Sequence, residues 1–172
     1  KSNGIEYNID EGAGCSVPLV TMNIHCSGTH TETANHIIKN APIISDFENL
    51  NFIPTQLISI TPESNSNEAY HADINQDDKV ITKDQLLKSL AAVDEFLDAV
   101  IIRTLPNDMK KKIRNYNSDN HPFLSNEAVY FLKSKGVKHI LLDIPSIDKF
   151  DDDGKLKNHK IFNWAGDYKF AE

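Results

Sequence analysis

The second half of the chain alternates helix-like and strand-like segments, and this alternation constrains the fold more than any other feature. Thr82 can cap a helix whose apolar positions recur at helical spacing, namely Leu86, Leu87, Leu90 and Val93. Residues 99–103 then form a short buried strand. Ser125 begins a second helix that Gly136 ends, with Val129, Phe131 and Leu132 on its apolar side, and the strongly apolar residues 137–144 follow as a strand. Repeated helix-then-strand units predict parallel strand pairing.

The first third of the chain is typical of strands and loops. Residues 17–24 are β-rich and broken only by Pro18, and residues 55–60 alternate and end before Pro62. We predict a strand in each, with an antiparallel character that contrasts with the second half. The His-, Thr- and Asn-rich segment between them has no clear periodicity and favours a loop or short helix. At 172 residues the chain fits a single α/β domain spanning 1–172.

Charge and cysteine content narrow the classes of function. The net charge of −7 disfavours a nucleic-acid partner, and the basic cluster of Lys110, Lys111, Lys112 and Arg114 is typical of the solvated face of a short helix. No apolar run approaches the roughly 20 residues that would span a bilayer. We therefore expect no membrane partner. Cys15 and Cys26 are too few for a disulfide scaffold, which favours a reducing, cytoplasmic location.

The segment 25–36 holds the densest cluster of residues that could carry chemistry. It places three His, one Cys and one Glu within twelve positions: His25, Cys26, His30, Glu32 and His36. Imidazole nitrogen, thiolate and carboxylate oxygen are ligands of divalent zinc, manganese and related ions. In an extended segment alternate residues point the same way, so His30 and Glu32 would face one ion together. The alternative is a polar surface loop whose histidines are merely solvated.

Gly28, Thr29 and His30, followed by Glu32 and His36, resemble the signature of the metal-dependent cyclase family, H-x-G-T-H-x-D-x-P-x-H. This family includes the bacterial kynurenine formamidases and the isatin hydrolases. Further segments resemble the family in the same order: residues 54–58, the helix from Thr82, residues 99–104, and residues 141–148 followed by His159.

The resemblance implies both a fold and a site. It implies a layered β/β/α domain of the swivelling type with a mixed sheet, assembled as a homodimer or larger oligomer. It implies metal ligands at His30, Glu32 and His159, a further carboxylate ligand at Glu172, and proton transfer by His36. The implied activity is metal-dependent hydrolysis of a small amide, cyclic imide, lactone or ester. A bound zinc, or else manganese, would activate water and polarise the substrate carbonyl.

Three positions depart from the family signature. Cys26 stands where the family has its first His ligand, Glu32 where it has Asp, and Ala34 where it has Pro. Cys26 can replace imidazole as a zinc ligand, and its softer sulfur would favour zinc. Alternatively, His25 is the ligand, or the position holds no ligand. The chain is also shorter than this family generally is. These departures motivate a second hypothesis, a protein that keeps the fold and the metal but has lost turnover.

A third hypothesis is a calcium-dependent interaction domain that uses the acidic segment from Asp73 to Asp84. This segment resembles a calcium loop, but Asp78 stands at the position that needs Gly and Asp84 at the position of the final Glu. Residues 151–154 favour a structural turn, and His71, His121 and His139 favour packing or surface roles. No Gly-rich phosphate loop or Gly-x-Ser-x-Gly motif is present in the sequence, which argues against nucleotide and serine-triad chemistry.

Overall fold

The computed structural model describes residues 7–47, 52–64, 66–92, 97–116, 120–163 and 169–171, the last three by their backbone alone. The chain divides into two compact units, Lys1–His30 and Thr31–Glu172. The expectation of one domain over 1–172 stays a prediction.

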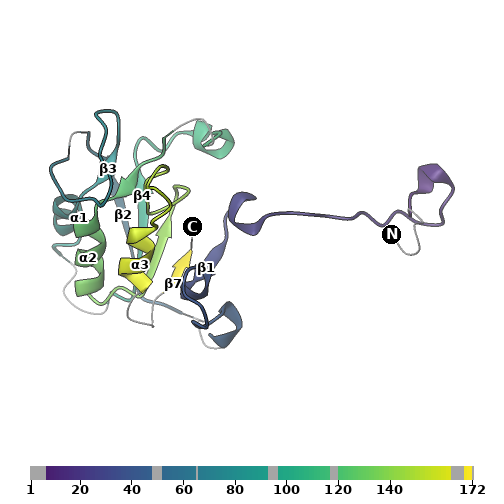
Figure 1. Ribbon diagram of the computed structural model, residues 1–172, viewed down its shortest axis with the longest axis horizontal. Coiled ribbons are helices and arrows are strands. Elements are labelled where there is room, and N and C mark those ends of the chain that lie inside the picture. Colours follow the sequence, from purple (N-terminus) through teal and green to yellow (C-terminus); the bar gives the residue numbers. More distant parts are fainter. Residues whose placement is uncertain are drawn as a thin grey trace. The chain divides into compact units, whose positions relative to one another are not determined.

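A five-stranded mixed sheet forms the centre of the larger unit (Figure 1). Its strands, in spatial order, are β1 (Thr31–Thr33), β7 (Lys169–Ala171), β6 (His139–Leu142), β4 (Ala99–Thr104) and β2 (Thr55–Ile60). Strand β1 pairs with β7 in antiparallel fashion, and every other neighbouring pair is parallel. A separate parallel pair is formed by β3 (Val80–Ile81) and β5 (Phe123–Leu124).

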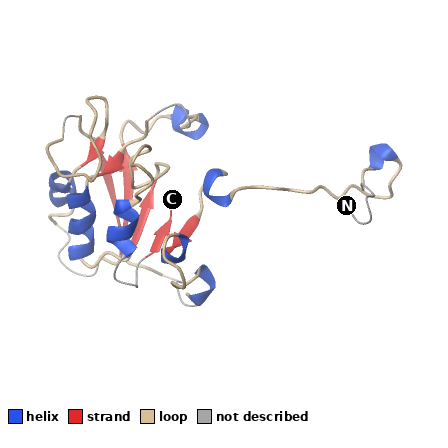
Figure 2. Ribbon diagram, viewed as in Figure 1, coloured by secondary structure: helices blue, strands red, loops and turns tan. Residues whose placement is uncertain are grey.

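Three α-helices lie together against one face of this sheet (Figure 2). They are α1 (Lys83–Ser89), α2 (Asn126–Ser134) and α3 (Lys157–Asn163). Helix α1 begins after Thr82, whose hydroxyl accepts from the Gln85 N–H, and α2 begins after Ser125, whose hydroxyl accepts from the Ala128 N–H. Each cap satisfies a backbone donor that the first turn would otherwise leave unpaired. Gly136, with φ of +80°, follows α2 in the left-handed conformation.

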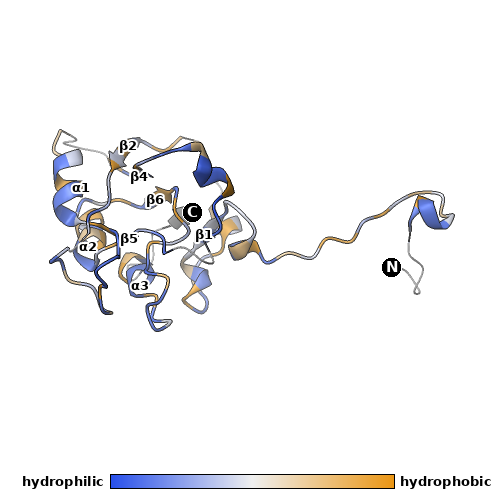
Figure 3. Ribbon diagram, turned by 90° about the horizontal axis from the view of Figure 1, so that it is seen from above, coloured by the Kyte–Doolittle hydropathy of each residue, from blue (hydrophilic) through white to orange (hydrophobic). Residues whose placement is uncertain are grey.

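The hydrophobic core lies between the sheet and these helices. Alternate residues of the strands point into it, and the apolar sides of the helices close it; the core members include Ile58, Ile60, Val100, Ile102, Ile140, Leu86, Val129, Leu132, Ile161 and Phe162. Figure 3 shows β6 as apolar over most of its length. Burial of such side chains contributes about 1.5–3 kcal/mol each. The core therefore fixes the strand ends and helix α3, from which the site is built.

Most of the predicted elements are confirmed. Both capped helices, the strand 55–60 and the parallel pairing of the second half are present, and the strand predicted over 99–103 extends to Thr104. The last predicted strand is shorter than 137–144, because the Val137 N–H bonds back to Leu132 at the end of α2. Strand β2 belongs to the first half yet runs parallel to β4, so the described antiparallel pairing there is limited to β1 and to an isolated bridge between Glu63 and Val80. Leu87 is 48% exposed and does not join the apolar face of α1, and Val93 lies outside the described residues.

The predicted strand over residues 17–24 is wrong. The described part of the Lys1–His30 unit contains no strand, and this segment ends in a short 3₁₀ turn, Ile24–Cys26. Its large apolar side chains are exposed, with Leu19 at 83%. β-Propensity yields a strand only when a neighbouring strand pairs its backbone N–H and C=O groups. No described residue supplies that ladder to residues 17–24.

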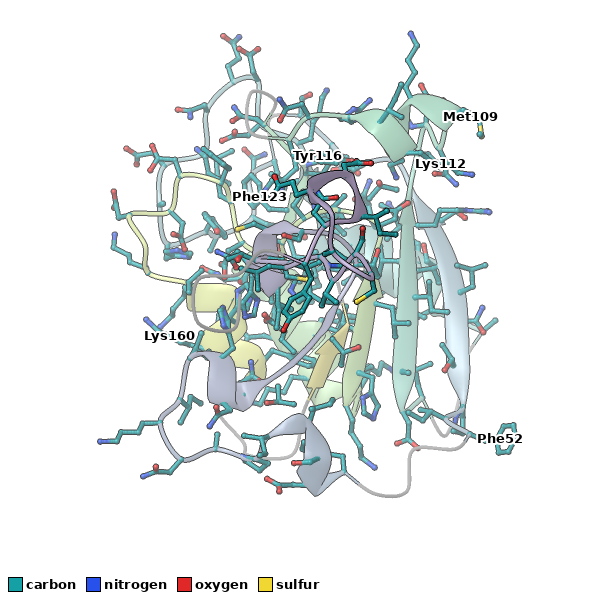
Figure 4. The ribbon with its side chains drawn as sticks, turned by 90° about the vertical axis from the view of Figure 1, so that its right-hand side faces the viewer. Phe52, Met109, Lys112, Tyr116, Phe123 and Lys160 are labelled. Carbon is teal, nitrogen blue, oxygen red and sulfur yellow. The ribbon has the colours of Figure 1, made fainter. Side chains whose placement is uncertain are left out.

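The basic cluster forms a short 3₁₀ helix, Met109–Ile113, as its charge pattern predicted. Met109 and Lys112 project outward from it, and Phe52, which is 98% exposed, projects away from the strands (Figure 4). Lys111 instead turns inward, and its ammonium lies 2.5 Å from a carboxylate oxygen of Asp143, which follows β6. None of the helices that the structure describes is long and apolar enough to cross a membrane.

Candidate metal centre

Glu32 sits in the middle of β1, where its backbone pairs with Phe170 of β7. Although it is a carboxylate, it is only 6% exposed. Thr33 then caps the 3₁₀ turn Ala34–His36 by accepting from the Asn35 N–H. This turn brings His36 back toward the strand, so that its Nε2 lies 3.8 Å from Oε2 of Glu32.

His159 approaches the same carboxylate from helix α3. It is 4% exposed, and its Nε2 lies 3.2 Å from Oε1 of Glu32. Its other ring nitrogen, Nδ1, lies 2.6 Å from Oδ2 of Asp148. Residues far apart in the sequence thus form a buried row in which His159 stands between two carboxylates.

Asp148 is held by an extensive set of donors. The backbone N–H groups of Asn158 and His159 donate to it, and so does the Tyr70 hydroxyl, at 3.1 Å. Burial raises the pKa of the Asp148 carboxyl, but the hydrogen bond and charge of His159 and the backbone N–H groups outweigh burial and hold that pKa below its ordinary value. Burial and the charge of Asp148 raise the pKa of the Tyr70 hydroxyl, which therefore stays protonated and donates.

The donor set fits a divalent transition ion. Zinc bonds to nitrogen and oxygen at roughly 2.0–2.2 Å in tetrahedral geometry, which places two ligand atoms about 3.3 Å apart. The distance of 3.2 Å between His159 Nε2 and Glu32 Oε1 matches this value, whereas the 3.8 Å between His36 Nε2 and Glu32 Oε2 is wider. A carboxylate on the far nitrogen of a ligating imidazole, as Asp148 provides, is the usual support for such a ligand.

In the Lys1–His30 unit, His25 and His30 lie together. Nδ1 of His25 is 3.1 Å from Nε2 of His30, and Nδ1 of His30 lies 2.9 Å from the Gly28 carbonyl oxygen. Cys26 is an exposed free cysteine. The choice between Cys26, His25 and no ligand at the first position stays a prediction.

The predicted site residues thus fall into three groups. The structure brings Glu32, His36 and His159 together in one unit. Cys26 and His30 belong to the other unit, so their joining Glu32 on one ion stays a prediction. Glu172 lies outside the described residues, and its role as a ligand stays a prediction as well.

Lys149 contacts the acidic segment from Asp73 to Asp84. The ammonium of Lys149 lies 2.7 Å from Oδ2 of Asp78 and 2.7 Å from the backbone carbonyl oxygen of Asp73. Asp84 is part of helix α1. A cation is therefore already supplied by the protein, which argues against the calcium-loop hypothesis.

Sequence reasoning assigned no role to Asp148 or Tyr70. Asp148 follows the last apolar strand, and a polar residue at that place could have drawn attention. Tyr70 lies 78 positions before Asp148 in a segment without periodicity, so no local signal could have linked the two. The turn at 151–154 is confirmed, with Asp153 and Gly154 in the left-handed region.

Taken together, the mixed sheet, the helices on one face and the buried carboxylate–imidazole row define a layered α/β protein with ligand groups suited to a metal. The Cyclase family model matches residues 6–149. The chain belongs to this family, and its fold is the family's fold.

Individual relatives are consistent with this membership. The chain is 26% identical over 154 residues to kynurenine formamidase of Bacillus cytotoxicus, covering 89% of this chain and 63% of that protein. It is 24% identical over 159 residues to kynurenine formamidase of Bacillus thuringiensis subsp. konkukian, covering 92% and 65%. The chain therefore spans just under two thirds of the length of these relatives.

Solved structures share the fold at lower identity. A structure described as a potential metal-dependent hydrolase with cyclase activity superposes with a TM-score of 0.59 at 18% identity, covering 88% of this chain and 63% of that one. An isatin hydrolase bound to the product analogue thioisatinate superposes with a TM-score of 0.53 at 15% identity, covering 88% and 59%.

Proposed function

We propose that the chain is a metal-dependent hydrolase of a small amide, cyclic imide, lactone or ester, similar to the arylformamidases. The observation that carries this proposal is the buried Glu32 carboxylate facing His159, whose ring is oriented by Asp148. The names of the relatives, kynurenine formamidase and isatin hydrolase, support the same class of reaction.

In this proposal Glu32 and His159 hold the ion, and His30, Glu172 and either Cys26 or His25 complete its ligands. Zinc is the first choice and manganese the alternative. A bound ion of this kind acidifies water and polarises a carbonyl. Asp148 accepts from Nδ1 of His159, which fixes the ring so that Nε2 faces Glu32.

We assign proton transfer to the leaving group to His36. Its side chain is 32% exposed, against 5% for His159, so substrate and water can reach it. Imidazole titrates near neutral pH, which suits a group that must both accept and donate a proton. Glu32, at 3.8 Å, stabilises the charged form of the ring between these two steps.

The test combines elemental analysis of the purified protein with a panel of formamide, imide, lactone and ester substrates. Glu32→Gln and His159→Gln should each lose the ion of this centre and hydrolysis, while His36→Ala should keep that ion and lose about 10²–10⁴-fold in turnover. His139→Gln serves as the matched control, because His139 lies in β6 and not in the buried row. A Glu32→Gln protein with full metal content and full activity would refute the proposal.

The same measurements distinguish this proposal from the second hypothesis. A wild-type protein that holds metal yet hydrolyses nothing in the panel would favour a member of the family that has lost turnover, as the departures at Cys26, Glu32 and Ala34 suggest. Assembly as a homodimer or larger oligomer and a cytoplasmic location belong to this proposal too. Both rest on the family resemblance and on composition.

A further inference from the structure

A second cluster of ligand groups shares Asp148 with the buried row. His71, Asp148 and Asp152 each offer one ligand atom, and the three atoms lie within 4.8 Å of one another. His71 belongs to the segment that precedes β3, and the other two belong to the loop between β6 and α3. Nε2 of His71 lies 3.3 Å from Oδ2 of Asp152.

The two carboxylates of this cluster are removed from water. Asp148 is 1% exposed and Asp152 4% exposed. Two negative charges at such short range in a buried setting repel each other strongly, and a bound cation would add to the positive charge that His159 and His71 can supply to them. The lysines nearest in the chain face other groups: Lys149 lies 2.7 Å from Asp78, and Lys155 lies 2.8 Å from the exposed Asp153.

The side chains of the cluster are held in place by their surroundings. The Leu156 N–H donates to Oδ2 of Asp152 at 2.6 Å, and the Tyr70 hydroxyl donates to Oδ1 of Asp148. The Asn126 amide lies 3.5 Å from Nδ1 of His71, on the far side of the ring from Asp152. Such outer contacts fix ligand orientation before an ion arrives, which favours binding.

Of the three ligand residues, Asp152 also lines a cavity of about 420 Å³. The cavity wall includes Tyr116, His121, Lys149 and Phe150. The cluster is therefore buried but not sealed.

We propose that His71, Asp148 and Asp152 form a second divalent metal site, distinct from the Glu32 centre. One imidazole nitrogen and two carboxylate oxygens suit manganese or zinc, whereas the imidazole disfavours calcium and magnesium. Asp148 would then serve two ions: it orients His159 at the first and binds the second directly. The second site does not depend on the proposed hydrolase activity.

The test is a titration of the metal-free chain with Mn²⁺, followed by electron paramagnetic resonance, because the sharp signal of the free ion disappears on binding. His71→Ala and Asp152→Asn should each bind one equivalent fewer than wild type. Glu32→Gln should lose the equivalent of the other centre and keep this one. Asp153→Asn is the matched control, since it removes one carboxylate from the same turn but from an exposed position, and it should titrate as wild type does.

Equal Mn²⁺ binding by wild type, His71→Ala and Asp152→Asn would overturn the site, and so would an equal loss in Asp153→Asn, which would indicate general acidic attraction. Asp152 also accepts the Leu156 N–H, so Asp152→Asn can disturb the turn. Circular dichroism of each variant checks the fold. If Asp152→Asn unfolds, His71→Ala and His71→Gln decide the matter, because both leave the Asp152 contact to Leu156 intact.

Discussion

Replacing Asp148 with Asn should damage both stability and metal binding. The Asp148 carboxylate accepts from His159 Nδ1, from the Tyr70 hydroxyl and from the backbone N–H groups of Asn158 and His159. Asn has the same size but replaces one oxygen by an NH₂ group. Both carboxylate oxygens accept hydrogen bonds. The NH₂ group of the amide must therefore face some of the present donors, and two donors cannot bond to each other.

The magnitude follows from the burial of these contacts. A hydrogen bond to a charged group contributes about 1.5–3 kcal/mol, and leaving a buried donor unpaired adds about 1–3 kcal/mol. We therefore expect Asp148→Asn to lower the free energy of unfolding by about 3–5 kcal/mol, the range found when one partner of a buried pair is removed. For a chain of this size, the melting temperature falls by roughly 2–4 °C per kcal/mol, so the expected drop is about 6–20 °C. Metal affinity should fall about 10–100-fold, because His159 loses its support.

Urea unfolding of the metal-free protein measures the change in the free energy of unfolding, and competition with a chelator measures the change in metal affinity. Asp153→Asn is the control, because its exposed carboxylate lies in the same loop and its loss should change the free energy of unfolding by less than about 0.5 kcal/mol. The reasoning is refuted if the free energy of unfolding of Asp148→Asn lies within about 0.5 kcal/mol of the wild-type value and its metal affinity is unchanged.

Three further changes probe the rest of the fold. Leu86→Ala opens space at a fully buried position and should cost about 2–5 kcal/mol in urea unfolding, while Leu87→Ala, which is half exposed, should cost far less; equal costs would contradict the assigned core. Ser125→Ala removes the cap of α2 and should cost about 0.5–2 kcal/mol, and an unchanged midpoint would speak against the cap. Lys149→Met leaves Asp78 buried without its cation and should cost about 3–5 kcal/mol. Calcium should not shift the wild-type melting temperature, and a clear rise would revive the calcium hypothesis.

Local signals in the sequence predicted the parts of the fold that depend on local chemistry. Thr82 and Ser125 predict where their helices begin, because each hydroxyl accepts a hydrogen bond from the backbone N–H three residues later. The apolar run in β4 also predicts a buried strand, because a run of apolar side chains favours burial. Residues 17–24 are also β-rich but form no strand, because pairing depends on residues elsewhere in the chain.

The candidate site was predictable only in part. Glu32, His36 and His159 could be named through a family resemblance, although nothing in their spacing brings α3 to β1. Asp148 and His71 were not assigned to a site, because their partners come from distant segments that only the folded chain brings near. His71, expected to be a packing or surface residue, instead faces Asp152.

The antiparallel pairing of β1 with β7 has a consequence for the order of synthesis. Thr31 is opposite Ala171, so the strand that carries Glu32 finds its neighbour only among residues made far later on the ribosome. Closing so long a loop is slow compared with forming the helices in between. A nascent chain would therefore expose Glu32 to water until the β7 segment emerges, and the pairing that buries this carboxylate forms only after that point.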